Sequence, residues 1–225
     1  MFWKMIYSCW SLFSWELLLN LEVLLKSLVH HLLWASNQKS KFVGNHASKE
    51  GDAIHLSQTL TKSEISLINN SLCYFYNNTA SIGAVFFVDV HVDIINRKTR
   101  FIFNYAFGPG GCFLVQEANS ILNIQSSFRL NYAKHDGGCL VLLHINYLLN
   151  VRSLFLNNSC GLLGGTIYIK NGTYLSNNRS CFMDNTANGG AAFYVSFLDC
   201  VWSLNSKYMN HTCKMGTRFF SISIG

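Results

Sequence analysis

Proline and charged side chains are scarce in this chain of 225 residues, which has one proline and 12% charged residues. Half of its residues are hydrophobic, and 17 Phe, 10 Tyr and 5 Trp supply apolar area for burial, which excludes a disordered polar chain. No charge-free apolar run reaches about 18 residues, so the sequence predicts no transmembrane helix.

Cysteine pairs and basic clusters are also missing. The eight cysteines contain no C-x-x-C pair, which argues against a zinc ribbon or a thioredoxin-type site, so we expect no metal and no cofactor. The net charge is +6, but the 17 Lys and Arg residues are scattered along the chain. Because there is neither a basic arm nor a recognised motif, we expect no nucleic-acid binding.

Residues 1–35 differ from the remainder of the chain. Residues 5–15 are uncharged and follow Lys4, as in a signal peptide, although no A-x-A-like cleavage site comes after them. Residues 17–34 place leucines on one side of a helix and polar side chains on the other, which is typical of a helix that caps the open end of a solenoid. We favour the capping helix, and a signal-peptide extension or a divergent first coil stays open.

The strongest pattern is a degenerate repeat, found six times. Each copy starts with an asparagine, and these are Asn37, Asn70, Asn96, Asn123, Asn150 and Asn177. Five positions later comes an aromatic residue, namely Phe42, Phe75, Phe101, Phe128, Phe155 and Phe182. Three positions further stands a second asparagine, namely Asn45, Asn78, Asn104, Asn131, Asn158 and Asn185. The leading asparagines are 33, 26, 27, 27 and 27 residues apart, and each copy continues into a glycine turn and an apolar run.

This unit fits three short strands separated by tight turns. The sequence therefore predicts an all-β fold, a single-stranded right-handed parallel β-helix of six or seven coils over residues 36–216, followed by a strand or tail at residues 217–225. Coils about 4.8 Å apart would stack each Phe on its copies, and the second asparagines would form an amide ladder. Cys112 and Cys139 occupy one repeat position, where they either form a disulfide or fill a column of small residues.

The repeat resembles that of the polymorphic outer-membrane proteins, which combine F-x-x-N with G-G-A-[ILV]. All six F-x-x-N motifs match, and one strict G-G-A occurs, at residues 189–191, where Gly189 and Gly190 align with the earlier glycine pair Gly164 and Gly165. The resemblance covers residues 37–216 and implies a right-handed β-helix exposed on a cell surface as an adhesin-like module.

Enzymatic β-helices, such as the pectin-lyase-like polysaccharide lyases and hydrolases, gather several acidic side chains on one face. This chain has 11 Asp and Glu in all, so we expect a protein without catalytic activity and keep such an enzyme as the alternative. The candidate catalytic residues are Asp89, His91 and Asp93, whose alternation would place them on one face of a strand as acid–base groups. The alternative interpretation is a solvated strand face.

A basic stripe emerges when the copies are aligned. Two positions after the leading asparagine stand Lys39, Leu72, Lys98, Gln125, Arg152 and Arg179, and Lys41 and Arg100 lie two positions further on in their copies. Stacked on one outer face, these cations would attract an acidic glycan. They would equally serve as a charged column that keeps the protein soluble and opposes sheet aggregation.

Six N-x-S/T sequons start at Asn69, Asn77, Asn157, Asn171, Asn178 and Asn210. They suit N-glycosylation in a secretory pathway, and they also suit asparagines required for turns. Together these patterns predict an extracellular or cell-surface binding module whose partner is an acidic glycan or a surface protein. A structural spacer, or a fragment of a larger repeat protein, is the remaining alternative.

Overall fold

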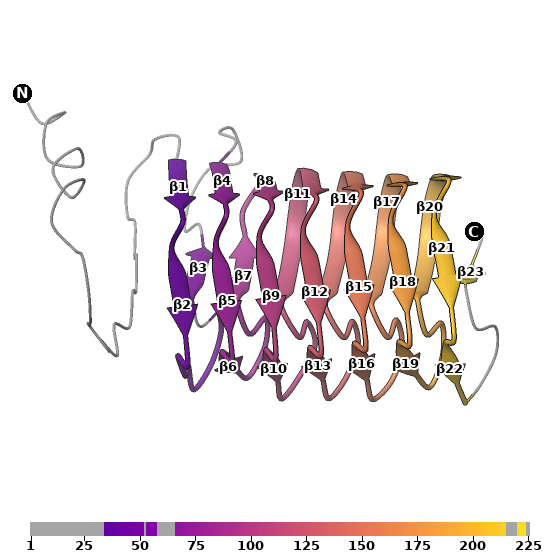
Figure 1. The fold of residues 1–225 in the computed structure, drawn as a ribbon, viewed down its shortest axis with the longest axis horizontal. Coiled ribbons are helices and arrows are strands. Elements are labelled where there is room, and N and C mark those ends of the chain that lie inside the picture. Colours follow the sequence, from indigo (N-terminus) through magenta and orange to yellow (C-terminus); the bar gives the residue numbers. More distant parts are fainter. Residues whose placement is uncertain (1–33, 52, 58–65, 215–219, 224–225) are drawn as a thin grey trace, which may run out of the picture.

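The computed structural model describes residues 34–51, 53–57, 66–214 and 220–223. Within these residues every element is a β-strand, all paired strands are parallel, and the chain winds into a solenoid (Figure 1). The predicted all-β parallel β-helix is therefore confirmed. Residues 1–33, which contain nearly all of the predicted capping helix or signal peptide, lie outside the described residues, and β1 begins at Trp34.

The strands form three sheets, here named A, B and C. Sheet A has ten strands: β1 (Trp34–Gln38), β3 (Ile54–Ser57), β4 (Ser66–Ser71), β7 (Phe86–Asp89), β8 (Val92–Arg97), β11 (Phe113–Ile124), β14 (Leu140–Val151), β17 (Ile167–Asn178), β20 (Phe193–Leu204) and β23 (Phe220–Ser223). Sheet B has seven: β2 (Lys41–Val43), β5 (Tyr74–Tyr76), β9 (Arg100–Ile102), β12 (Ser127–Arg129), β15 (Leu154–Leu156), β18 (Cys181–Met183) and β21 (Lys207–Met209). Sheet C has six: β6 (Thr79–Ala80), β10 (Tyr105–Ala106), β13 (Tyr132–Ala133), β16 (Ser159–Cys160), β19 (Thr186–Ala187) and β22 (Thr212–Cys213).

One coil passes through all three sheets. In the later coils the sheet A strand is twelve residues long and curves over the top of the solenoid (Figure 1). Sheet B continues downward from the end of that strand, and sheet C closes the coil at the bottom (Figure 1). The third strand predicted for each copy is thus the second half of this long strand, because no turn interrupts the chain between the halves.

The centre of the core is a column of stacked phenylalanine rings, one from each of the first six sheet B strands. Neighbouring ring centroids from Phe42 to Phe182 lie 4.5 to 4.9 Å apart, and their planes differ by 9° at most. Tyr208 extends the column by one more ring, at 5.2 Å from Phe182. Because equivalent residues repeat at the coil spacing, like side chains meet like, as predicted.

Both asparagine positions form buried ladders. In each ladder the side-chain amide of one coil donates to the amide oxygen of the next, as from Asn104 to Asn131 at 3.0 Å and from Asn96 to Asn123 at 2.9 Å. The second ladder also binds the backbone, because Asn131 Oδ1 accepts from the N–H of Asn104. Its members are Asn45, Asn78, Asn104, Asn131, Asn158 and Asn185.

The interior also holds a hydroxyl ladder that the sequence analysis did not predict. Its members stand three positions after each leading asparagine from Asn96 onward, and Ser206 continues the ladder in the last coil. Ser126 Oγ accepts from the N–H of Thr99 and donates to the carbonyl oxygen of Asn96, and both residues are buried. The members are Thr99, Ser126, Ser153, Ser180 and Ser206. Together the three ladders pair polar groups that the narrow core would otherwise leave unsatisfied.

The paired glycines have two different roles. The first, as in Gly137, has φ +63°, which favours glycine. The second permits close approach between coils, because a Cβ on Gly138 would lie 2.1 Å from the carbonyl oxygen of Gly165. In the last of these turns the sequence alignment was wrong by one residue: Gly190 has the positive φ, and Ala191 takes the position of Gly165.

Cys112 and Cys139 are fully buried free thiols in adjacent coils. The backbone N–H of Cys112 donates to the carbonyl oxygen of Cys139, which places the pair in one column with Val85 and Thr166. Cys112 and Cys139 therefore fill a column of small and medium side chains and do not form a disulfide.

Candidate functional site

The predicted basic stripe lies at the junction where sheet A passes into sheet B. All six aligned positions have a left-handed backbone, with φ between +49° and +57°, and all six side chains are exposed. A left-handed residue at every coil turns the chain from one sheet into the other, which explains why these side chains point outward. The junction column is Lys39, Leu72, Lys98, Gln125, Arg152 and Arg179.

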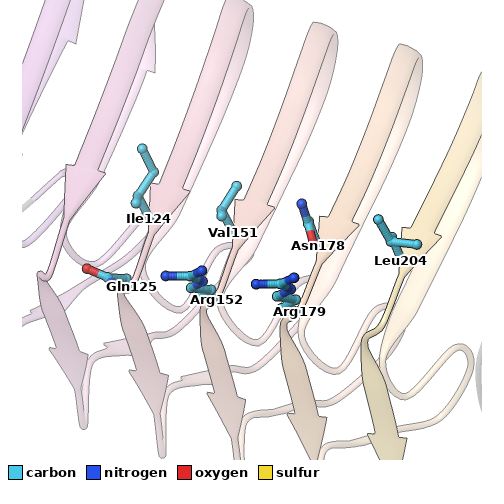
Figure 2. A pocket seen from close by; sticks show the side chains of 7 residues that line it. All are labelled: Ile124, Gln125, Val151, Arg152, Asn178, Arg179 and Leu204. Carbon is cyan, nitrogen blue, oxygen red and sulfur yellow. The ribbon is translucent and has the colours of Figure 1, made fainter.

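A groove of about 350 Å³ follows this junction across the later coils. Figure 2 shows Gln125, Arg152 and Arg179 in one row, with Ile124, Val151, Asn178 and Leu204 in a second row beside it. Residues of successive coils are in register, so the two arginines are one coil apart, about 4.8 Å along the solenoid axis. The groove therefore combines a row of hydrogen-bond donors with a largely apolar wall.

The charge around the groove has one sign. Within the described residues, no carboxylate lies within 4 Å of the guanidinium groups of Arg152 or Arg179. Arg97 and Lys98 form a second basic group toward the N-terminal end of the same junction. Both groups leave their positive charge available to an anion, because no neighbouring side chain neutralises it.

Lys41 and Arg100 lie beside the junction column rather than in it. They are the first residues of β2 and β9, and both are exposed on the outer face of sheet B. They share this position with Lys207, the first residue of β21. The structure thus gives a row of corner cations and a second row on the adjoining sheet.

The acidic candidates are arranged differently from the prediction. Val88, Val90 and Val92 are buried, which turns Asp89, His91 and Asp93 outward, but a bend at residues 90–91 separates β7 from β8. The three side chains therefore do not share the face of one continuous strand. Asp93 is already engaged, since its Oδ1 accepts hydrogen bonds from Asn119 Nδ2 at 3.0 Å and from Ser120 Oγ.

His91 instead lines a hollow of about 670 Å³ at the bend of the long strands. Strand pairing places it one coil from Glu117 and two coils from His144, with Asp199 at the far end of the hollow. Sequence analysis missed Glu117 and His144. Glu117 follows His91 by 26 residues and His144 follows Glu117 by 27, which are also the spacings of the leading asparagines. Glu117 and Asp199 are about three coils or 14 Å apart, beyond the 5–9.5 Å that separates the carboxyl pair of glycosidases.

No protein-family model, curated protein or solved structure matches this chain. The candidate site therefore rests on its own geometry. In the described part of the chain no cluster of three or more His, Cys, Asp or Glu side chains is arranged to hold a metal ion. No helix among those residues is long and apolar enough to span a bilayer.

The sequons differ in accessibility. Asn77, Asn157, Asn171 and Asn210 are exposed, and all four have a left-handed backbone with φ between +52° and +58°. Asn69 and Asn178 are half-buried; Asn69 Oδ1 accepts from Arg97, and Asn178 Oδ1 is buried beside the groove without a hydrogen-bond partner. The left-handed backbone thus favours asparagine at all four positions, and the same exposure makes them the accessible acceptors for a glycan.

Proposed function

We propose that this protein is a non-catalytic binding module of the extracellular space or cell surface, and that its junction groove binds an acidic glycan. The observation that carries the proposal is the register of Arg152 and Arg179 along one groove, with no carboxylate beside either of them. Guanidinium groups bind carboxylates and sulfates through paired hydrogen bonds, and a rigid row one coil apart suits a linear polymer with repeated anionic groups.

The six F-x-x-N motifs support placing the chain with the polymorphic outer-membrane protein repeats, whose members are adhesin-like and surface-exposed. The four exposed sequons favour a secretory route. The distribution of carboxylates favours binding over catalysis, because Asp93 is hydrogen-bonded by Asn119 and Ser120, and Glu117 and Asp199 in the hollow are about three coils apart. A surface protein with an acidic patch is the alternative partner for the same groove.

Heparin affinity with the full chain tests the proposal. Each solvent-exposed charge pair contributes about 1 kcal/mol, so Arg152→Ala with Arg179→Ala should weaken heparin binding about 30-fold. Binding of the wild type should also fall as salt is raised.

The matched control is Lys134→Ala with Lys170→Ala, which removes two exposed cations outside the groove and the outer face of sheet B. This control should bind heparin like the wild type. Equal losses in both double variants would reduce the effect to net charge and refute the groove. A wild type that binds no acidic glycan would leave the spacer as the better description.

A further inference from the structure

We propose that the outer face of sheet B, a surface separate from the junction groove, docks on a lipid bilayer that carries anionic headgroups. The face consists of the first and third residues of the seven sheet B strands, whose middle residues point into the core. This proposal does not depend on glycan binding, because it uses different side chains.

The charge on this face is entirely positive. Its cations are Lys41, Arg100, Arg129 and Lys207, and no Asp or Glu occupies any of its fourteen outward positions. Serine occurs once, at Ser127, and every other position holds an aliphatic, aromatic or sulfur-containing side chain. Nine of the fourteen outward side chains are thus apolar, aromatic or sulfur-containing, and an exposed face with so many of them is typical of an interaction surface.

Two apolar side chains project from the lower rim of the face at a cost to the backbone. Phe103 and Leu130 follow β9 and β12 with φ +56° and +54°, and their side chains are 46% and 42% exposed. In the other coils the same corner holds residues that tolerate this conformation, namely Gly44, Asn77, Asn157, Asp184 and Asn210, so the rim also carries one carboxylate. The ring of Phe103 packs edge to face against Tyr76 with the centroids 5.8 Å apart, whereas exposed apolar residues in a strained conformation are also typical of a binding role.

A lipid surface matches these features better than other partners. The face is a straight row of seven strands, about 29 Å long, and it presents Tyr74 and Tyr76, a residue type enriched at the membrane interface. Each lysine or arginine near anionic headgroups raises the affinity of the protein for the membrane by up to about one order of magnitude. A second copy fits poorly, because a two-fold pair would bring unneutralised cations against one another. The apolar and aromatic side chains between the cations suit the interface of a bilayer better than a hydrophilic glycan.

Vesicle sedimentation with the full chain tests the proposal. The protein should sediment with vesicles of phosphatidylcholine and phosphatidylserine and stay in solution with phosphatidylcholine alone. Arg100→Ala with Arg129→Ala should weaken binding to the mixed vesicles about 30-fold. Equal binding to both vesicle types, or to neither, would overturn the proposal.

The sharpest variant is Phe103→Asn with Leu130→Asn. Asparagine tolerates the left-handed backbone, so this change relieves strain while removing the two apolar groups, and the melting temperature should stay constant or rise. Vesicle binding should fall at least about tenfold. The matched control is Phe197→Asn, which has φ +59° and 48% exposure but lies at the bend of β20.

The control should bind vesicles like the wild type. Unchanged vesicle binding by Phe103→Asn with Leu130→Asn would overturn the proposal, as would self-association through this face in place of vesicle binding. Loss of heparin binding in the Arg152→Ala, Arg179→Ala variant with vesicle binding retained would separate the two surfaces. Failure of the groove and failure of the face therefore give different results.

Discussion

Replacing Asn131 by alanine tests whether the amide ladder stabilises the fold. Asn131 is fully buried in the middle of its column. Its Oδ1 accepts from the backbone N–H and the side-chain amide of Asn104, both at 3.0 Å. Its Nδ2 donates to the carbonyl oxygen of Phe101 and to Asn158 Oδ1, also at 3.0 Å. Alanine removes all four hydrogen bonds and leaves no side chain long enough to replace them.

The size of the effect follows from these contacts. The buried N–H of Asn104 loses the acceptor that the side chain of Asn131 supplies, which costs about 1–3 kcal/mol, and each remaining bond contributes about 0.5–1.5 kcal/mol. We therefore expect Asn131→Ala to lower the free energy of unfolding by about 4 kcal/mol. The reference is Asn45→Ala at the half-buried end of the ladder, where one side-chain donor bond, to Asn78, is lost and about 1 kcal/mol is expected.

Urea unfolding followed by far-UV circular dichroism measures both variants. The slope of the transition must be the same in wild type and variants, because neighbouring coils of a solenoid can unfold separately. If the two variants differ by less than about 1 kcal/mol, the ladder does not stabilise the interior as argued. Asn131→Asp adds a further comparison, because its carboxylate would face two acceptor oxygens and should be the least stable of the three.

Two further predictions concern titratable side chains. His211 continues the asparagine column, and its Nδ1 accepts a hydrogen bond from the N–H of Asn185. Burial lowers the pKa of His211 from the ordinary value of 6.5. The contribution of His211 to stability is therefore complete above pH 6.5 and is lost as the pH falls toward the lower pKa of the folded state. His211→Asn should remove this part of the pH dependence, and an unchanged stability profile between pH 5 and 8 would contradict the assignment. Burial raises the pKa of Cys160 to about 12, whereas Cys200 is exposed. Ellman's reagent should therefore modify Cys200 in the native protein and Cys160 only after unfolding. Rapid modification of Cys160 in the native Cys200→Ser variant would refute this prediction.

Sequence reasoning reached the fold because the period of the chain is also the period of its contacts. Phe128 lies over Phe101 for the same reason that the two are 27 residues apart, so one alignment predicted the ring column. The alignment failed where a coil is one residue shorter, and it placed Gly189 where Gly190 belongs. The hydrogen-bonded pairing of neighbouring coils, rather than the residues of the motif, decides that register.

The candidate site could be predicted only in part from the period of the sequence. Spacing alone selected Arg152 and Arg179, because residues one period apart must be neighbours. Spacing did not reveal the bend at residues 90–91 that separates Asp89 from Asp93, or the hydrogen bonds that Asn119 and Ser120 donate to Asp93.

The amino-acid sequence by itself determined which side chains repeat and therefore which ones stack, since inward and outward alternation is a local property of a strand. Tertiary structure decided which columns of stacked side chains lie next to one another. The bend of the long strands gathers the column of His91 and Glu117 and the column of Asp199 around one hollow. The left-handed corners set an apolar wall beside the arginines and project Phe103 and Leu130 from sheet B. Those relations depend on how far the backbone turns at each corner, and that angle is a property of the assembled coil.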